Sequence, residues 1–325
     1  MKICLHSNQL DNRGTGKAIR DYGKALRNIL NHEVCYMSSS SSNNESLSLI
    51  SKNFPVYLYN GHADRQTGFN VKAEIEQLVE KHKIDFFYMI KSGVDDNATP
   101  TNCKAGIHYV FNGSEPHGNV YAAVSKTLAE KYKRNKFVPH IVRSLPPSKD
   151  IRTELNIPKN ALVVGRHGGY DTFDLPFVHE AIQQVLEKRK DIYFLFLSTK
   201  PFTSHERVIH FENILNEQGI YNFIHACDIM LHARHMGETF GLSVGEFAAC
   251  NKPVMTWHGL GHNFYDTAHI VQLKDKAILY SDKNEIINYL SNIKPIDFAG
   301  TNWDTFTEIF GDNNVIRQYE KVFLK

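Results

Sequence analysis

Short apolar runs alternate with amphipathic stretches along the sequence, and this alternation restricts the fold more than any other feature. Lys2–His6 is predicted to be a buried strand, and Ala18–Leu30 places Ile19, Tyr22 and Leu26 on one face of a helix. Strands that alternate with helices are typical of a parallel sheet covered by helices on both faces. The sequence therefore predicts an α/β protein.

The alternation occurs twice, on either side of a segment that contains prolines. Val138–Pro147 holds three of them, which disfavour helix and favour extended chain, so we interpret it as the interdomain connection. Before it, further strands are predicted at 34–37, 56–59, 85–90, 106–111 and 121–124. After it, strands are predicted at 161–165, 192–197, 208–211, 228–232 and 253–257, with a helix at 175–190.

The length of 325 residues also favours two domains, because one hydrophobic core rarely supports so long a chain. We predict two Rossmann-like domains in series, at 1–145 and 146–302. The last segment, Trp303–Leu324, is amphipathic and is predicted to be helical. We expect residues 303–325 to return to the N-terminal domain and complete it.

Composition excludes several classes of protein. The hydrophobic fraction of 42% and net charge of +2 are those of a soluble globular protein and give no indication of a nucleic-acid partner. The five cysteines form no CxxC pair, which argues against a disulfide framework or a zinc site and fits a reducing compartment. No apolar run approaches the roughly 20 residues that span a bilayer. Without a recognisable signal peptide, a cytoplasmic protein is expected.

Two glutamates mark the strongest candidate site. Glu238 and Glu246 are separated by seven residues across a predicted loop-to-helix transition, so their carboxylates can lie roughly 12 Å apart. That spacing is too large to hold one atom but suits the two ends of an elongated ligand. The amides of Phe240, Gly241 and Leu242 would lie at the helix N-terminus, where free N–H groups and the helix dipole favour an anion such as a diphosphate.

The residues around these glutamates resemble the Glu-x7-Glu region of retaining GT-B glycosyltransferases of the large family four. The usual pattern there is Ala-Asp, an apolar strand, Glu-x-Phe-Gly, a second Glu and Gly-Lys-Pro-Val. Here Cys227 replaces the alanine, and Asn251, which suits a left-handed residue after a helix, replaces the glycine. The resemblance implies a GT-B fold, with two Rossmann-like domains facing each other across a cleft. It also implies that Glu238 faces the hydroxyls of the donor sugar and Glu246 those of the ribose.

A glycine-containing segment near the N-terminus extends the resemblance. Gly14, Thr15 and Gly16 follow the first predicted strand and open a helix, as the family's glycine-rich donor loop does. A simple tight turn is the alternative, because Gly-x-Gly alone is a weak signal for phosphate binding.

The second domain opens with a further candidate for the donor diphosphate. The family has an arginine at this point and a lysine a few residues later; Arg166 matches the arginine, but no lysine follows it. Lys200 or the amides of Gly168 and Gly169 are alternatives for the missing contact. The alternative role for Arg166 is a surface or interdomain salt bridge.

Two histidines are candidates for the residue that, in the family, reaches the transferred sugar from the end of an N-domain strand. His117 lies in a predicted loop, which favours access to ligand, whereas His108 lies within a predicted strand and is a candidate core residue. A structural role is an alternative for both. Nearer the strongest site, His232, Arg234 and His235 precede Glu238 and are candidates for the nucleotide side.

The basic segment Lys126–Lys136 is predicted to be helical. A solvated helix face is the favoured interpretation, and weak peripheral contact with anionic lipid is the alternative.

Taken together, these features predict a retaining glycosyltransferase that moves a sugar from a nucleotide-diphosphate donor to a glycan, lipid or other hydroxyl acceptor. No Asp-x-Asp sequence occurs, in keeping with the metal independence usual for the family, and neither a metal nor a further cofactor is expected. Two alternatives stay open: a sugar-nucleotide epimerase on the same fold, and a catalytically silent nucleotide-sugar binder.

Overall fold

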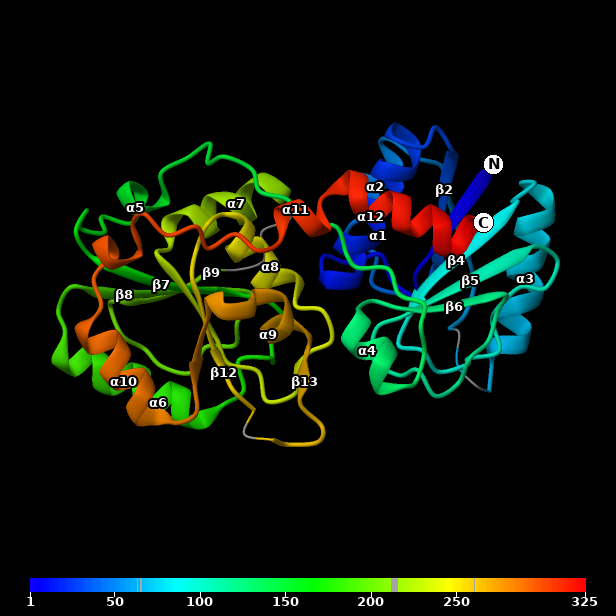
Figure 1. The fold of residues 1–325 in the computed structure, drawn as a ribbon. Coiled ribbons are helices and arrows are strands. Elements are labelled where there is room, and N and C mark those ends of the chain that lie inside the picture. The colour runs from blue at the N-terminus through cyan, green and yellow to red at the C-terminus, as the bar shows by residue number, and fades with distance from the viewer. Residues whose placement is uncertain (63, 65, 212–215, 260) are drawn as a thin grey trace. The chain divides into compact units, whose positions relative to one another are not determined.

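Two compact units make up the chain (Figure 1). The computed structural model describes residues 1–62, 64, 66–211, 216–259 and 261–325. The N-terminal unit comprises Met1–Ile141 and Phe310–Lys325, and the C-terminal unit comprises Val142–Ile309. The division lies inside the proline-containing segment, slightly before the expected boundary at 145. The final segment joins the N-terminal unit from residue 310 onward, so residues 303–309 belong to the other unit.

The N-terminal unit is a parallel sheet with helices on both faces. Its strands are β1 (Lys2–His6), β2 (Glu33–Ser39), β3 (Val56–Tyr59), β4 (Phe86–Lys91), β5 (Lys104–Tyr109) and β6 (Val120–Ala123). Its helices are α1 (Gly14–Asn28), α2 (Leu47–Ser51), α3 (Gly68–Lys81), α4 (Lys126–Lys131) and α12 (Asp312–Tyr319), which continues into a π-helical turn, Glu320–Leu324.

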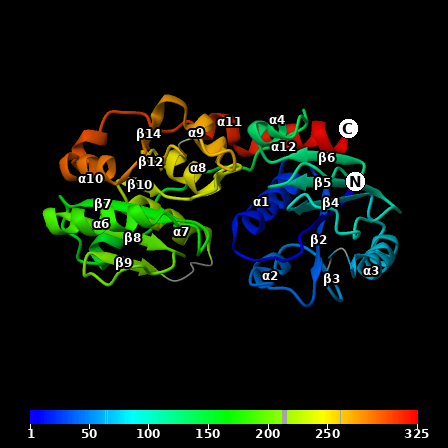
Figure 2. The ribbon, with the colours of Figure 1, turned by 90° about the horizontal axis from the view of Figure 1, so that it is seen from below.

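Among the described residues, the strand order of this sheet is β3-β2-β1-β4-β5-β6, with every pair parallel. This is the Rossmann order, in which the two halves of the sheet meet at β1 and β4. Figure 2 shows the sheet between α1 on one face and α3 on the other. Beneath α3, Val71 and Ile75 pack against Cys4 and Phe87 of the central strands.

The C-terminal unit repeats this architecture. Its main strands are β7 (Leu162–His167), β8 (Ile192–Leu197), β9 (Val208–Phe211), β10 (Ile229–His232), β12 (Val254–Trp257) and β14 (Ala277–Tyr280). Its helices are α5 (Ile151–Glu154), α6 (Pro176–Lys188), α7 (Glu217–Ala226), α8 (Leu242–Ala249), α9 (Ala268–Leu273) and α10 (Lys283–Asn292), with α11 (Thr307–Phe310) at the passage between units. Two short strands, β11 (Gly237–Glu238) and β13 (Asp266–Thr267), pair separately, and 3₁₀ turns occur at Lys274–Lys276 and Pro295–Phe298.

In the described part of this unit, the sheet order β14-β12-β10-β7-β8-β9 is the same Rossmann order, with β7 and β10 at its centre. Helices α6 and α10 lie together on one face, where Val178, Ile182 and Ile286 enter the main apolar core (Figure 2). The α/β prediction of two Rossmann-like units is confirmed. Of the strands in the two large sheets, only β14 was not predicted; it is an edge strand whose Leu279 is exposed.

Two predicted helices are shorter than the sequence indicated. The basic segment Lys126–Lys136 is helical only to Lys131, because Lys133 takes a left-handed backbone conformation and Phe137 then pairs with Ala123 of β6. The predicted helix Trp303–Leu324 begins at 307 and is interrupted at 311, before α12. Among the described residues, no helix has both the length and the apolar character needed to cross a membrane.

The C-terminal turn is bound to the N-terminal sheet by one aromatic side chain. Phe323 is fully buried, and its ring centroid lies 5.3 Å from that of Tyr88 and 4.9 Å from that of Tyr319. Gly106 of β5 makes room for it, since a Cβ there would lie 2.8 Å from the Phe323 ring. The final segment is therefore part of the core of the N-terminal unit.

We expect Phe323→Ala to lower the free energy of unfolding by about 3–5 kcal/mol, because truncating a buried phenylalanine leaves a cavity. Urea denaturation measures the change. Lys321→Ala, an exposed change in the same turn, is the control and should alter stability by less than about 0.5 kcal/mol. Similar losses in the two variants would contradict the packing of Phe323 as the main anchor.

Candidate functional site

The carboxyl ends of β7 and β10 locate the candidate site in the C-terminal unit. The two strands are parallel neighbours. After β7 the chain continues to β8 and β9 on one side, and after β10 it continues to β12 and β14 on the other side. Such a switch point leaves a crevice outside the strand ends, where α/β proteins bind ligands. Arg166 and His167 end β7, and His232 ends β10, so the loops after these residues form the site.

Arg166 places a buried positive charge beneath the loop after β7. Its guanidinium donates hydrogen bonds to Thr172 Oγ1 at 2.7 Å and to the Gly169 carbonyl at 2.9 Å, and also to the Thr199 hydroxyl after β8. Among the described residues, no carboxylate forms an ion pair with it. Burial lowers the pKa of Arg166 to about 10, so the group is still a cation at neutral pH. Arg166 therefore orders this loop through its hydrogen bonds. Within the described part of the chain, the positive charge of Arg166 is not neutralised by an acid in contact with it.

Other residues predicted for the diphosphate lie in the same region. Gly168 lets the loop approach the guanidinium, since a Cβ there would lie 2.9 Å from Arg166 Nη2. The exposed Lys200 follows β8, and its backbone N–H donates to the Tyr170 carbonyl at 2.9 Å. The structure thus brings Arg166, Gly168, Gly169 and the backbone of Lys200 together.

Glu238 is held as a fixed carboxylate. Arg234 Nη1 donates to its Oε2 at 2.7 Å, and His232 Nε2 lies 3.2 Å from its Oε1. Burial on its own would raise the pKa of Glu238, but the hydrogen bond from His232 and the charge of Arg234 outweigh it and lower the pKa to about 2. The carboxylate is 17% exposed and ionised at neutral pH, so it can accept hydrogen bonds but cannot act as an acid.

A buried polar chain supports His232 from behind. His232 Nδ1 lies 2.8 Å from the Thr256 hydroxyl on β12, and this hydroxyl lies 3.0 Å from His269 Nε2 on α9. Burial lowers the pKa of His269 well below its usual value, so it is neutral. Of the three candidates for the nucleotide side, His232 and Arg234 contact Glu238, and the backbone N–H of His235 donates to Asp174 Oδ1. Thr256 and His269 were missed, although Thr256 is the single polar residue in an apolar strand.

Helix α8 begins between the two glutamates, as predicted. Gly241 precedes its first residue, Leu242, with a φ of 85°, a left-handed conformation that favours glycine. Phe240 is buried on the N-terminal side of the helix. After the helix, Asn251 has a φ of 57°, which confirms the predicted left-handed residue at this end.

Glu246 lies in the middle of α8 and faces β7. It is 1% exposed, and its Oε2 lies 3.1 Å from His167 Nε2. His167 therefore links the second glutamate to the strand that carries Arg166. Sequence reasoning did not select His167, although it directly follows Arg166; the strand was predicted to end at 165, whereas β7 continues to His167.

The two candidate histidines of the N-terminal unit are both covered. His108 is wholly buried, with Nδ1 2.6 Å from the Tyr88 hydroxyl and Nε2 2.9 Å from the Val138 carbonyl, and burial lowers its pKa to about 4. It has the core role that the sequence left as an alternative, rather than a place beside a ligand. His117 Nδ1 lies 2.7 Å from the Glu115 carbonyl, and the side chain is only 9% exposed, with its ring centroid 5.6 Å from that of Tyr121 on β6.

The segment Gly14, Thr15 and Gly16 forms the first turn of α1 rather than a loop. A Cβ on Gly16 would lie 2.1 Å from the Asp11 carbonyl, so close backbone packing accounts for this glycine.

Sequence reasoning also missed polar groups at the carboxyl edge of the N-terminal sheet. His6 Nε2, at the end of β1, lies 2.9 Å from the Tyr59 hydroxyl at the end of β3. Lys91 Nζ, at the end of β4, forms a 2.5 Å ion pair with Asp96. Each of these residues ends an apolar strand or closely follows one, which is the signal that could have found them.

Comparisons with known proteins agree with this architecture. No protein-family model matches the chain, and no curated protein matches it. Among solved structures, a glycosyltransferase from Rickettsia africae is 16% identical, with a TM-score of 0.73 over 99% of this chain and 97% of that one. Anabaena HepE in complex with UDP-glucose is 14% identical, with a TM-score of 0.75 over 99% and 98%. A putative UDP-N-acetylglucosamine 2-epimerase from Listeria monocytogenes is 13% identical, with a TM-score of 0.63 over 98% and 94%. Likeness at this level shows the fold, which is α/β of the GT-B type.

We expect Arg234→Ala to raise the pKa of Glu238 by at least one unit from about 2, because the cation is lost while the burial stays. A titration of the carboxyl carbon by ¹³C NMR measures this, with the exposed His235→Ala as control. The folded pKa lies below the ordinary 4.5, so ionised Glu238 stabilises the fold above about pH 5 and loses this effect as the pH falls toward 2. An unchanged pKa in Arg234→Ala would show that the ion pair does not hold the carboxylate.

Proposed function

We propose that the chain is a retaining glycosyltransferase that moves a sugar from a nucleotide-diphosphate donor to a glycan, lipid or other hydroxyl acceptor. The observation that carries the proposal is the placement of Glu238 and Glu246 on either side of the α8 N-terminus, beside the switch point of a Rossmann sheet. Anabaena HepE, which has the same fold, is recorded in complex with UDP-glucose, and this supports a nucleotide sugar as the donor.

The two glutamates are assigned to opposite ends of the donor. Buried Glu246 accepts hydrogen bonds from the ribose hydroxyls, with His167 fixing one of its oxygens. Glu238, held by Arg234 and His232, accepts them from hydroxyls of the transferred sugar. Hydrogen bonds to ionised acceptors are roughly twice as strong as neutral ones, so fixed carboxylates select a ligand with hydroxyls at both places.

The diphosphate is assigned to the region between them. The amides of Gly241 and Leu242 lie at the start of α8, directly after Phe240, where the N–H groups and the dipole of the helix favour an anion. Arg166 contributes a fixed positive potential, while its hydrogen bonds shape the loop that presents the Gly168 and Gly169 amides. A preorganised positive site stabilises the charge that develops on the departing diphosphate without any reorganisation. The Lys200 side chain is exposed, unlike that of Arg166, and it supplies the second positive charge to the diphosphate.

Retention follows when the acceptor attacks the face from which the diphosphate leaves. The anomeric C–O bond to the diphosphate breaks, the acceptor oxygen bonds to the same carbon, and the departing phosphate takes the acceptor proton. This route needs no protein nucleophile, which accords with the low pKa and fixed pairing of Glu238. The N-terminal unit is assigned the acceptor, at the carboxyl edge that carries His6 and Lys91.

A sugar-nucleotide epimerase is the second candidate. The putative epimerase from Listeria monocytogenes shares the fold, and histidines lie beside both glutamates here, so acid–base chemistry has residues available. A catalytically silent binder is the remaining alternative.

A panel of UDP-, GDP-, ADP- and dTDP-sugars separates these candidates. We expect one donor to raise the melting temperature of the protein, because ligands that bind the folded state stabilise it. With that donor radiolabelled, the label should move to a lipid or glycan acceptor with its anomeric configuration kept. Conversion to an isomeric sugar nucleotide would establish the epimerase instead, and binding without either product would establish a silent binder.

The two glutamates should differ in which ligand they affect. We expect Glu246→Ala to weaken the binding of free nucleoside diphosphate at least tenfold, because it removes charge-assisted hydrogen bonds to the ribose. Glu238→Ala should leave that affinity nearly constant and reduce turnover of the intact donor. Calorimetry and product assays measure the two effects, and Glu180→Ala on the outer face of α6 is the control. Equal losses in both glutamate variants would refute the division of roles.

A further inference from the structure

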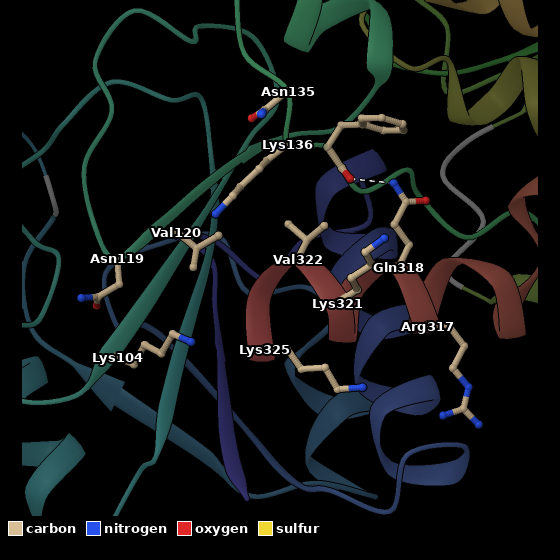
Figure 3. Close-up of a pocket in the computed structure, with 11 residues that line it drawn as sticks. Lys104, Asn119, Val120, Asn135, Lys136, Arg317, Gln318, Lys321, Val322 and Lys325 are labelled. Carbon is tan, nitrogen blue, oxygen red and sulfur yellow. Dashed lines mark hydrogen bonds between the residues drawn. The ribbon is translucent and has the colours of Figure 1, made fainter.

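A basic hollow lies in the N-terminal unit, between the sheet and the C-terminal helix. It has a volume of about 840 Å³. Figure 3 shows Lys104 and Lys136 on its strand side and Lys321 and Lys325 on its helix side. The remaining lining residues are Asn119, Val120, Asn135, Phe137, Arg317, Gln318 and Val322.

The charge of this hollow is of one sign. Five of its lining residues are lysine or arginine, and no described lining residue has an acidic side chain. In the described part of the chain, Lys104, Lys136 and Lys321 form no ion pair. Lys325 and Arg317 share the single acid Glu320, at 3.1 and 3.7 Å. Cations gathered around one hollow repel one another, and an anion bound among them relieves that repulsion.

The hollow is formed by ordered elements that are distant in sequence. Lys104 and Val120 are the first residues of β5 and β6. Gln318 Nε2 donates to the Phe137 carbonyl at 2.7 Å, which joins the helix to the chain along β6, and the same bond is drawn in Figure 3. Buried Phe323 holds the turn that carries Lys321. The cations are therefore brought together by the fold itself rather than by one basic stretch of sequence.

The position of the hollow separates it from the proposed acceptor edge. His6 and Lys91 lie at carboxyl ends of strands, where Rossmann sheets usually bind ligands. Lys104 and Val120, in contrast, lie at amino ends of strands in the same sheet. The hollow is thus a second place on this unit, with its own chemistry.

We propose that this hollow binds a ligand that presents two or more phosphate groups. Lysine ammonium groups are mobile point charges that suit phosphate oxygens, and the amides of Asn119 and Asn135 add neutral donors. Val120 and Val322 give the hollow an apolar part that fits the carbon skeleton of such a ligand. A soluble polyphosphorylated compound and a phospholipid headgroup share this chemistry, and the experiment separates them.

Inorganic tripolyphosphate is the first probe, with binding to the full chain measured by calorimetry. The test variant is Lys136→Glu/Lys321→Glu, and the control is Lys52→Glu/Lys81→Glu, which changes the net charge equally at exposed positions outside the hollow. We expect the test variant to bind at least tenfold more weakly than the wild type, and the control to bind within about twofold. If charge reversal prevents folding, Lys136→Gln/Lys321→Gln replaces the test variant.

Vesicles identify the source of the phosphate groups. Vesicles of phosphatidylcholine with cardiolipin, a lipid that carries two phosphate groups, are compared with phosphatidylcholine alone in a co-sedimentation assay. If the protein binds the anionic vesicles and the test variant does not, the hollow is assigned to a lipid headgroup. The basic segment Lys126–Lys136 by itself does not predict a contribution from Lys321. Tripolyphosphate binding without vesicle binding assigns it to a soluble ligand.

Hydrogen exchange then locates the site. We expect tripolyphosphate to protect the amides of residues 315–325 in the wild type and not in the test variant. Equal behaviour of test variant and control toward both probes, or no binding of either probe by the wild type, would overturn the proposal. Affinity for a nucleotide-sugar donor should be the same in both variants, so failure here is distinguishable from failure of the proposed function.

Discussion

The parallel pairing of β7 with β10 is the constraint on which the candidate site depends. Crossover connections in a parallel sheet are right-handed, so the chain builds the sheet outward from β7 on one side and from β10 on the other. The two loops that leave these strands then diverge and leave the strand ends uncovered. Arg166 and His232 stand at these ends because they are the last residues, or nearly the last, of buried strands. The same constraint places His6 and Lys91 at the edge of the N-terminal sheet.

Around the C-terminal crevice, charge is buried in a pattern that suits a ligand with different groups along its length. A buried charge is unfavourable unless hydrogen bonds or an opposite charge compensate it. Glu238 has both kinds of compensation, from His232 and Arg234, whereas the hydrogen-bond partners of Arg166 are neutral oxygens. An ionised carboxylate can accept hydrogen bonds from hydroxyl groups, and a guanidinium attracts an anion. A nucleotide sugar has hydroxyls at both ends and a diphosphate between them.

In the N-terminal unit, one packing interaction has two consequences. Phe323 fills the space above Gly106, which brings the last turn of the chain onto the sheet. The opposite side of that turn carries Lys321, which then faces Lys104 and Lys136 across the basic hollow. The last turn of the chain therefore contributes both to the stability of the unit and to the hollow. Phe323 supplies the packing, and Lys321 supplies the charge.

The sequence by itself determined the features that arise from local pattern. Strands such as β1, β3 and β8 were predicted at their observed bounds because apolar runs between turns depend on near neighbours. The start of α8 between Glu238 and Glu246 was likewise readable, since capping and spacing are local. Only the tertiary structure decided which residues distant in sequence come into contact. It buried His108 against the carbonyl of Val138, bound Arg166 to the loop after β7, and ended α4 where the chain turns to join β6. It also gathered Lys104 and Lys321 at one hollow, because the contacts that join residues so far apart in sequence exist only once the chain has folded.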